Sequence, residues 1–353
     1  MKSLRELLLG GTAIKELPSS TIHLKELSMV SFKGCQLSSS SLTSMPRSLG
    51  IDLSDCNLSA IPSGICISEK EFIGLFLRGN DFVSLPESIS QFSGITHLYL
   101  DGCKSLRSLS NIPSKVRFIC VDNCTSLERL PEPPNDFYWA GTYFNFTAQC
   151  FNCFKLAYNI KSFSNIFQGQ SRQQFEKRYI IPGREIPKWF EKVNICDSSV
   201  VSRYDSGSLE TRTYKIKKVK IQLPGSGSWS GIVLCVVFLP SDLHRRYEQG
   251  HMISVTGCPT DYPKFTSEYG KVELHHLWLH SVSKFDSRLL KTPRFHQVEL
   301  EIKTQGLEVE KIGFRVIPIK ISEAHDEDDG EFFSSLLLPA YQRGRQTSQG
   351  FGE

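Results

Sequence analysis

The chain has 353 residues, of which 40% are hydrophobic and 22% are charged, and its formal net charge is +4 at pH 7. These ordinary values exclude a largely disordered chain, and the length suggests about two domains. The small net charge, without Lys/Arg runs interleaved with aromatic residues, argues against a nucleic-acid-binding protein. The longest apolar run, 231–240, is much shorter than the roughly 20 residues of a membrane-spanning helix.

A leucine-spaced pattern recurs six times within residues 1–130. Its third apolar position advances in steps of 23, 21, 24, 23 and 21 residues, as Leu9, Phe32, Leu53, Leu77, Leu100 and Val121. Another apolar residue stands two positions earlier, and a small or amide residue stands three positions later, as Thr12, Cys35, Cys56, Asn80, Cys103 and Cys124. This agreement indicates the L-x-x-L-x-L-x-x-N/C-x-L pattern of leucine-rich repeats.

We therefore predict an α/β leucine-rich-repeat solenoid over residues 1–134. Each repeat would form one short strand on a concave face, followed by a turn and a return segment that often ends in a Leu-Pro or Ile-Pro pair. Stacked repeats would bury a common core. The chain opens inside a repeat without a polar cap. We therefore expect a truncated product or a fragment, with more repeats once preceding it.

The residues between the core leucines would project from the concave face of such a solenoid. They are Ser31, Lys33, Asp52, Ser54, Phe76, Arg78, Tyr99, Asp101 and Asp122. An unused strand face would also be polar, but aromatic and arginine side chains supply much of the energy of protein contacts. Extended concave faces are the usual binding surfaces of solenoids, so we predict that these residues bind a protein.

Cysteine usage favours a reducing compartment. The chain has eleven cysteines, of which four lie in the repeat pattern, and its first residues lack an apolar signal-peptide core. We therefore expect a cytoplasmic or nuclear protein. Cys150 and Cys153 form a C-x-x-C within residues 135–177, which we interpret as an aromatic-rich helical cap and connector. Because no second Cys or His pair lies nearby at zinc spacing, structural thiols are favoured over a metal site.

From residue 178 onward the apolar period changes to two, as in 219–223, 298–302 and 312–316. The run 232–239 is continuously apolar, which suits a central strand covered on both faces. Strand candidates separated by turn-rich stretches predict an all-β sandwich over residues 178–322. Residues 323–353 begin with an acidic stretch and predict a linker with a disordered tail.

A search for catalytic motifs finds none: the sequence has no phosphate-binding P-loop, no G-x-S-x-G and no H-E-x-x-H. His275, His276 and His280 form the most prominent cluster of metal-binding residue types. On a strand, His276 and His280 share a face but lie roughly 13 Å apart, which is too far for one metal ion. We therefore expect a solvated strand face there, and no catalytic, metal or cofactor residue.

Two later segments resemble a known family. Residues 146–156, FTAQCFNCFKL, are similar to an F-x-N-C-x-K-L segment that follows the repeats of plant TIR-type intracellular immune receptors. Residues 181–190, IPGREIPKWF, resemble the P-G-x-E-I-P-x-W-F signature of their post-repeat jelly-roll/Ig-like domain, and the match continues in order to about residue 322. The residues that carry this signature are Pro182, Gly183, Glu185, Ile186, Pro187, Trp189 and Phe190.

These signature residues also have a physical interpretation of their own. Pro182 and Gly183 predict a tight turn in which the glycine is free to adopt a positive φ. Trp189 and Phe190 are large apolar anchors, so we expect a packing role rather than a ligand contact.

The resemblance implies a non-enzymatic region that senses pathogen effectors, or host proteins that they modify, and that cooperates with full-length immune receptors. NAD cleavage and nucleotide binding belong in this family to TIR and nucleotide-binding domains, which are not represented in these 353 residues. We therefore expect protein partners, no enzymatic activity, no cofactor, no nucleic acid and no membrane span. The alternative is a carbohydrate-binding β-sandwich on a repeat scaffold, which would need exposed tryptophans and clustered carboxylates in one groove.

Overall fold

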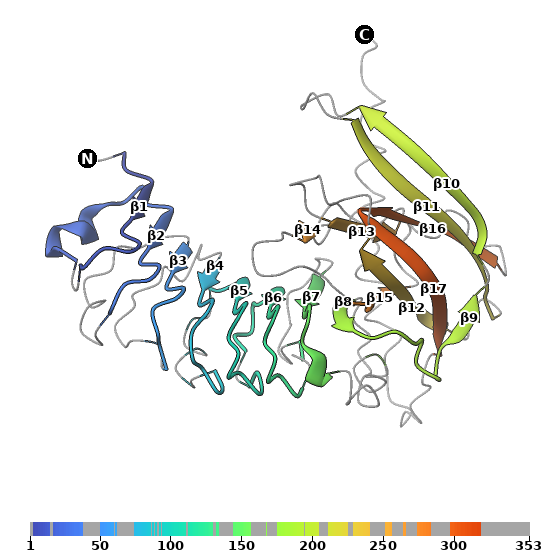
Figure 1. The fold of residues 1–353 in the computed structure, drawn as a ribbon, viewed down its shortest axis with the longest axis horizontal. Helices are drawn as coiled ribbons and strands as arrows, with labels where there is room; N and C mark the ends of the chain where they lie inside the picture. Colours follow the sequence, from blue (N-terminus) through green and yellow to red (C-terminus); the bar gives the residue numbers. More distant parts are fainter. Residues whose placement is uncertain are drawn as a thin grey trace, which may run out of the picture. The chain divides into compact units, whose positions relative to one another are not determined.

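The computed structural model describes residues 3–14, 17–37, 50–59, 74–85, 94–110, 112–129, 144–156, 175–193, 195–204, 211–224, 229–240, 251–255, 264–265, 274–283 and 297–318, together with residues 61, 87, 89, 92, 132, 133 and 167. The described strands form two sheets, one of twelve strands and one of five (Figure 1). The predicted acidic linker and tail, 323–353, lie outside the described residues.

The first part of the twelve-stranded sheet is a ladder of short parallel strands, coloured from blue to green in Figure 1. It consists of β1 (Glu6–Leu8), β2 (Met29–Ser31), β3 (Gly50–Asp52), β4 (Gly74–Phe76), β5 (His97–Tyr99) and β6 (Phe118–Cys120). The middle residues of these strands are in register and belong to the core, from Leu7 beside Val30 to Leu98 beside Ile119. Because side chains alternate along a strand, the flanking residues lie on the opposite face. The strand positions therefore follow the spacing of the sequence pattern.

Buried thiols connect successive rungs of the ladder. The Sγ atom of Cys56 donates to the carbonyl oxygen of Phe32 at 3.1 Å, and Cys103 and Cys124 make the same contact with the preceding rung. Asn80 stands at the equivalent position, and its Nδ2 atom donates to the carbonyl oxygens of Leu53 and Leu77, both at 2.9 Å. These side chains therefore satisfy carbonyl groups where the backbone turns away from the sheet, beyond acting as apolar filler.

The prediction of an α/β solenoid is wrong, because the structure is nearly all β. In the described part of residues 1–134, the segments between strands are turns, bends and short 3-10 segments such as η1 (Ser19–His23). Proline explains much of this difference. It lacks a backbone donor and holds the preceding residue in an extended conformation, and Pro18 stands directly before η1.

The ladder continues into the segment that we predicted as a helical cap. β7 (Phe144–Gln149) pairs in parallel with β6, and β8 (Phe175–Pro182) pairs in parallel with β7. A helical prediction for 144–149 is therefore wrong. The side chains of Phe146 and Ala148 are buried in the same core as the ladder residues. The phenylalanine and threonine residues of this segment also favour a strand, because aromatic and β-branched side chains are common in strands.

Beyond β8 the same sheet becomes antiparallel. β8 pairs with β15 (His276–Ser283), followed by β12 (Trp229–Pro240), β17 (Leu307–Pro318) and β9 (Glu191–Val193). The prediction of a separate sandwich over 178–322 is thus corrected. Its strands share a sheet with the ladder because β8 offers one edge to β7 and the other to β15, and residues Met1–Pro318 group into one compact unit.

The second sheet is antiparallel and contains β10 (Ile195–Tyr204), β11 (Thr211–Gln222), β16 (Gln297–Gln305), β13 (His251–Val255) and β14 (Lys264–Phe265), in that order. The period-two residues of β11 and β16 belong to a core shared with β12. β12 is buried on both faces, as its continuous apolar run predicts. Val233, Cys235 and Val237 enter the core of the ladder, and the alternate residues enter the core of the second sheet.

The signature 181–190 packs around the end of β8. A Cβ atom on Gly183 would lie 2.8 Å from Leu277 Cγ, so the close approach of Leu277 requires a glycine here. Its φ is not positive, in contrast to the positive φ that the sequence suggested. Trp189 and Phe190 stack at 4.0 Å, and both pack against the ladder core. Two further residues of the signature differ in exposure: Ile186 is buried, and Glu185 forms an exposed ion pair with Lys311 at 2.7 Å.

Candidate functional site

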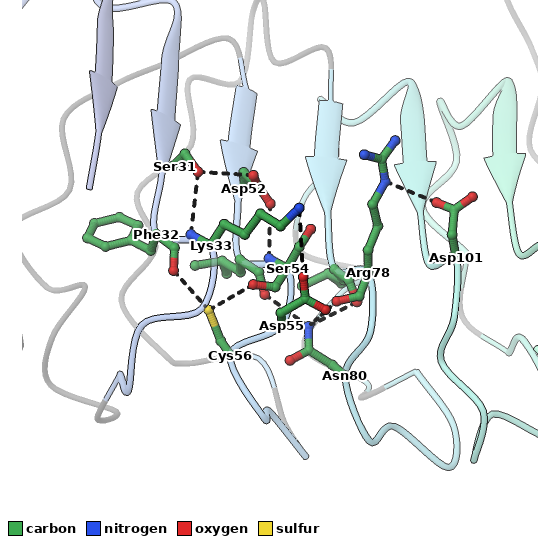
Figure 2. Close-up of polar contacts among 12 residues, drawn as sticks. Ser31, Phe32, Lys33, Asp52, Ser54, Asp55, Cys56, Arg78, Asn80 and Asp101 are labelled. Atoms are coloured by element: carbon green, nitrogen blue, oxygen red, sulfur yellow. Dashed lines mark hydrogen bonds and ion pairs between the residues drawn. The ribbon is translucent and has the colours of Figure 1, made fainter. Parts of the chain in front are cut away.

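An aromatic and arginine cluster lies on the face of the ladder opposite the core. The rings of Phe76 and Tyr99 stack with centroids 4.4 Å apart and planes 5° apart. The guanidinium of Arg78 lies 5.1 Å from the centroid of the Phe76 ring and 4.9 Å from that of Tyr99. Its Nε atom donates to Asp101 Oδ2 at 3.1 Å (Figure 2). Stacking and the hydrogen bond together hold the guanidinium in one orientation.

Two further aromatic residues extend this cluster along the neighbouring strands. The ring of Phe118 lies 5.5 Å from that of Tyr99 and 5.7 Å from that of His97. We call Phe76, Arg78, His97, Tyr99 and Phe118 the aromatic platform; each of the five is half-buried. His97 and Phe118 were not among the predicted binding residues. Both occupy the first position of their strand, on the same face as the residues that were predicted, and this position could have identified them.

Gly74 makes room for the platform. A Cβ atom at this position would lie 3.2 Å from Cε2 and 3.5 Å from Cζ of the Phe76 ring. The ring therefore lies over the glycine, where any side chain would displace it. Half-buried rings held in this manner bind a partner with little further loss of side-chain freedom.

The N-terminal part of the same face carries a polar chain of hydrogen bonds. Ser31 Oγ donates to Asp52 Oδ2 and the backbone N–H of Ser54 donates to Asp52 Oδ1, both at 3.0 Å (Figure 2). Ser31 and Ser54 are buried, whereas Lys33 is exposed and pairs loosely with Asp55 at 3.9 Å. Of the predicted binding residues in this part, Lys33 and Asp52 are the ones that reach the surface.

Asp101 and Asp122 are buried together with Cys120 beneath the platform. The Cys120 thiol donates to Asp101 Oδ1 at 2.5 Å, while Asp122 accepts from Gln149 Nε2 at 2.7 Å and from the backbone N–H of Phe151 at 2.8 Å. Burial and the nearby charge of Asp101 raise the pKa of Asp122 to about 7. The side chains of both aspartates therefore support the platform and are not exposed on it.

The potential metal-binding atoms of Asp101, Cys120 and Asp122 lie within 4.8 Å of one another. Each carboxylate oxygen already accepts a hydrogen bond, with Arg78 and Cys120 on Asp101 and the two donors named above on Asp122. Burial and the neighbouring carboxylates also raise the pKa of the Cys120 thiol well above its ordinary value, which disfavours the thiolate that a metal ion would need. The arrangement is that of a satisfied internal hydrogen-bond cluster.

The histidines of β15 do not form the solvated face that we predicted. His276 and His280 are fully buried, because β15 lies between β8 and β12 and its two faces are covered. His276 Nδ1 lies 2.9 Å from the carbonyl oxygen of Leu274, and its Nε2 accepts from the backbone N–H of Asn152 at 3.2 Å. This pair of contacts requires a neutral ring, and burial lowers the pKa of His276 to about 4.

The C-x-x-C pair is part of the ladder. Cys150 and Cys153 are buried free thiols, and Cys153 donates to the carbonyl oxygen of Val121 at 3.0 Å.

The tryptophans that a carbohydrate groove would need are also placed in the core: Trp229 and Trp278 are buried, and Trp189 is half-buried.

One comparison with known proteins points to plant defence. No family model matches the chain. Over 213 aligned residues it is 28% identical to the disease resistance-like protein DSC1 of Arabidopsis thaliana, which covers 54% of this chain and 17% of that protein. The chain thus spans less than a fifth of this relative. The similarity supports a relationship with plant disease resistance proteins and a role related to plant defence. No helix in the described residues is long and apolar enough to cross a membrane.

Proposed function

We propose that the chain is a non-enzymatic recognition region of a plant intracellular immune receptor, which binds a pathogen effector or a host protein through the aromatic platform. The observation that carries this proposal is the stack of Phe76 and Tyr99 with Arg78 over both rings. Aromatic and arginine side chains that are held in place and partly accessible are typical of the energetic centre of a protein interface. The disease-resistance relative supports the biological setting.

The proposal places the protein in the cytoplasm or the nucleus. Eight cysteines have side chains that the structure describes, and all eight are buried free thiols. Reduced, buried cysteines suit a reducing compartment, where the partners would be effectors delivered into the cell or the host proteins that these effectors modify.

The binding proposal is tested with the full chain expressed in infected leaf tissue and fused to a proximity-labelling enzyme. The chain with Phe76→Ala, Arg78→Ala and Tyr99→Ala is compared with the unaltered chain. Phe154→Ala is the matched control, because Phe154 is an exposed aromatic residue outside the platform. We expect the triple variant to lose a labelled protein that both the unaltered chain and Phe154→Ala retain. Equal labelling by all three chains would contradict the proposal.

A further inference from the structure

Asp101 and Asp122 form a buried pair of carboxylates on neighbouring rungs of the ladder. Their side chains belong to the group whose polar atoms lie within 4.8 Å of one another, and the thiol of Cys120 interacts with both. The backbone joins the two rungs at the same point, because the N–H of Gly102 donates to the carbonyl oxygen of Asp122 at 2.7 Å. Two like charges this close in a buried site are unfavourable, so below about pH 7 the pair holds one proton.

Arg78 decides which of the two carboxylates carries the negative charge. Its Nε atom donates to Asp101 Oδ2 at 3.1 Å, and Asp101 is buried in this ion pair (Figure 2). A cation in contact with Asp101 favours the charged form of that carboxylate. The proton is therefore placed on Asp122, whose pKa is raised to about 7 by burial and by the charge of Asp101.

The other titratable groups around the pair are neutral at pH 7. They come from β5 and β6 and from the turns that follow β5, β6 and β7, and burial raises the pKa of each. They are Tyr99, Cys103, Cys120, Cys124, Cys150 and Cys153. The position of the Arg78 guanidinium is therefore what distinguishes the two carboxylates electrostatically.

The hydrogen bonds of Asp122 suit an ionised carboxylate. Its Oδ2 accepts from Gln149 Nε2 at 2.7 Å, and its Oδ1 accepts from the backbone N–H of Phe151 at 2.8 Å. Hydrogen bonds to charged groups are stronger, so an ionised Asp122 holds both donors more tightly than a protonated one. Asp101 accepts, besides Arg78, a weak thiol donor. Without Arg78, the donors therefore favour the charge on Asp122 and the proton on Asp101.

Phe151 connects this pair to the antiparallel strands. Its backbone belongs to the turn after β7, but its side chain is buried in the core of the second sheet. The ring lies 4.9 Å from that of His276 on β15 and 6.4 Å from that of Phe238 on β12. The next backbone N–H, that of Asn152, donates to His276 Nε2 at 3.2 Å. A change in the hydrogen bond between Asp122 and Phe151 therefore acts on the contact between the ladder and the antiparallel strands.

We propose that the two aspartates transmit the state of the aromatic platform to this contact. When Arg78 moves away from Asp101, the proton leaves Asp122 and is taken up by Asp101, so the charge of the pair is unchanged and only its position moves. Ionised Asp122 then binds the N–H of Phe151 more tightly. The coupling is a property of the chain itself, and its use to report a partner that draws Arg78 away rests on the proposed function.

The proton is located by ¹³C NMR of the full chain with carboxyl-labelled aspartate at pH 6.5, with the two signals assigned from Asp101→Asn and Asp122→Asn. We expect protonated Asp122 and ionised Asp101 in the unaltered chain, and the reverse in Arg78→Met. Arg78→Lys keeps a cation beside Asp101 and should behave as the unaltered chain does. Arg117→Met is the matched control, because Arg117 is an exposed arginine before β6, outside the platform. Any other placement of the proton in Arg78→Met, or the same change in Arg117→Met, would overturn the proposal.

The effect on the ladder is measured by hydrogen exchange of single backbone amides at the same pH. The Asn123 amide, which donates to the carbonyl oxygen of Phe151 at 2.7 Å, is the internal reference. Relative to it, we expect the Phe151 amide to exchange about fivefold more slowly in Arg78→Met than in the unaltered chain. Adding Asp122→Asn should abolish this slowing. Unchanged or faster relative exchange in Arg78→Met would contradict the coupling.

Both measurements use the chain without a partner, and circular dichroism melting checks that each variant folds. The coupling can therefore fail while the platform still binds a protein, and the platform can fail to bind while the coupling holds.

Discussion

The Sγ atom of Cys153 donates a hydrogen bond to the carbonyl oxygen of Val121 at 3.0 Å, the contact that Cys124 makes with Leu100 at 3.2 Å. The C-x-x-C pair is therefore one more rung of the ladder: Cys150 takes the core position and Cys153 takes the thiol position three residues later. The sequence contains this signal, since Val121 and Cys124 have the same spacing. A search for zinc-binding motifs alone does not find this shared spacing.

The ladder thiols should be chemically silent in the folded protein. Burial raises the pKa of Cys103 to about 12 and those of Cys124, Cys150 and Cys153 well above the ordinary value. At pH 7.5 we expect these four cysteines to remain unmodified by iodoacetamide in the native protein and to react fully in guanidinium. Peptide mass spectrometry measures this difference. Modification of Cys150 or Cys153 under native conditions would contradict their place in the ladder.

Asn80 should stabilise the ladder more than its size suggests. It is buried, its Nδ2 atom donates to two carbonyl oxygens, and its Oδ1 accepts from the backbone N–H of Leu58 at 2.9 Å. Asn80→Ala leaves these groups unsatisfied and should lower the free energy of unfolding by about 2–4 kcal/mol in urea titrations. Asn80→Cys restores the thiol donor of the other rungs and should cost less. A smaller loss for alanine than for cysteine would contradict this account.

The close contact of Gly183 with Leu277 should appear as a coupled pair. A Cβ at position 183 would lie 2.8 Å from Leu277 Cγ and 2.9 Å from its Cδ1, so Gly183→Ala should destabilise the protein by about 1–3 kcal/mol through overpacking. Leu277→Ala removes the obstructing atoms at its own cavity cost. The double variant should therefore lose less stability than the sum of the two single variants. Strict additivity in urea titrations would show that the two side chains do not compete for the same space.

Asp122 should make stability depend on pH. Its folded pKa is raised to about 7, so between its unfolded pKa of about 3.9 and that value the native state binds more protons than the unfolded state. Stability attributable to Asp122 therefore falls as pH rises through this window, by up to about 1.4 kcal/mol per pH unit, and levels off above pH 7.

Asp122→Asn isolates this contribution, because the amide cannot ionise and Gln149 can rotate its own amide to pair with it. His276 acts in the opposite direction: its folded pKa is lowered to about 4, so its contribution falls as pH falls from about 6.5 to about 4. The difference in unfolding free energy between the unaltered chain and Asp122→Asn removes the His276 effect. The unfolding free energy of the unaltered chain, relative to that of Asp122→Asn, should fall from pH 5 to pH 7.5. A difference that stays constant over this range would contradict the raised pKa of Asp122.

The positions of the strands could be predicted because each rung must bury one middle residue, and that requirement leaves a regular apolar spacing in the sequence. The continuous apolar run of β12 predicted a strand covered on both faces, because a strand buried on both sides has no polar positions. Residues on its two faces belong to two different cores. The connections could not be predicted in this way. A return segment without α-helix carries no periodicity of its own, so the α/β assignment rested on a general expectation for such repeats.

Long-range pairing limited the prediction of the site. Asp101 and Asp122 lie at positions that project from a strand, but Gln149 and Phe151 of the next rung cover Asp122, and Arg78 and Cys120 bind Asp101. The burial of His276 similarly depends on β8 and β12 flanking β15, strands that are distant in the sequence. Residue type and spacing indicated which side of the strand these residues occupy, but not which neighbours cover them.

The aromatic platform is the protein-binding site in the proposed function. The deciding measurement is the equilibrium dissociation constant, by biolayer interferometry, of the partner recovered with the unaltered chain for Phe76→Ala, Arg78→Ala, Tyr99→Ala and Phe154→Ala. We predict that at least two of the three platform variants bind tenfold or more weakly, a loss of about 1.4 kcal/mol each, while Phe154→Ala binds as the unaltered chain does. Unchanged affinity in all three platform variants, with their folds intact by circular dichroism, would contradict the central claim.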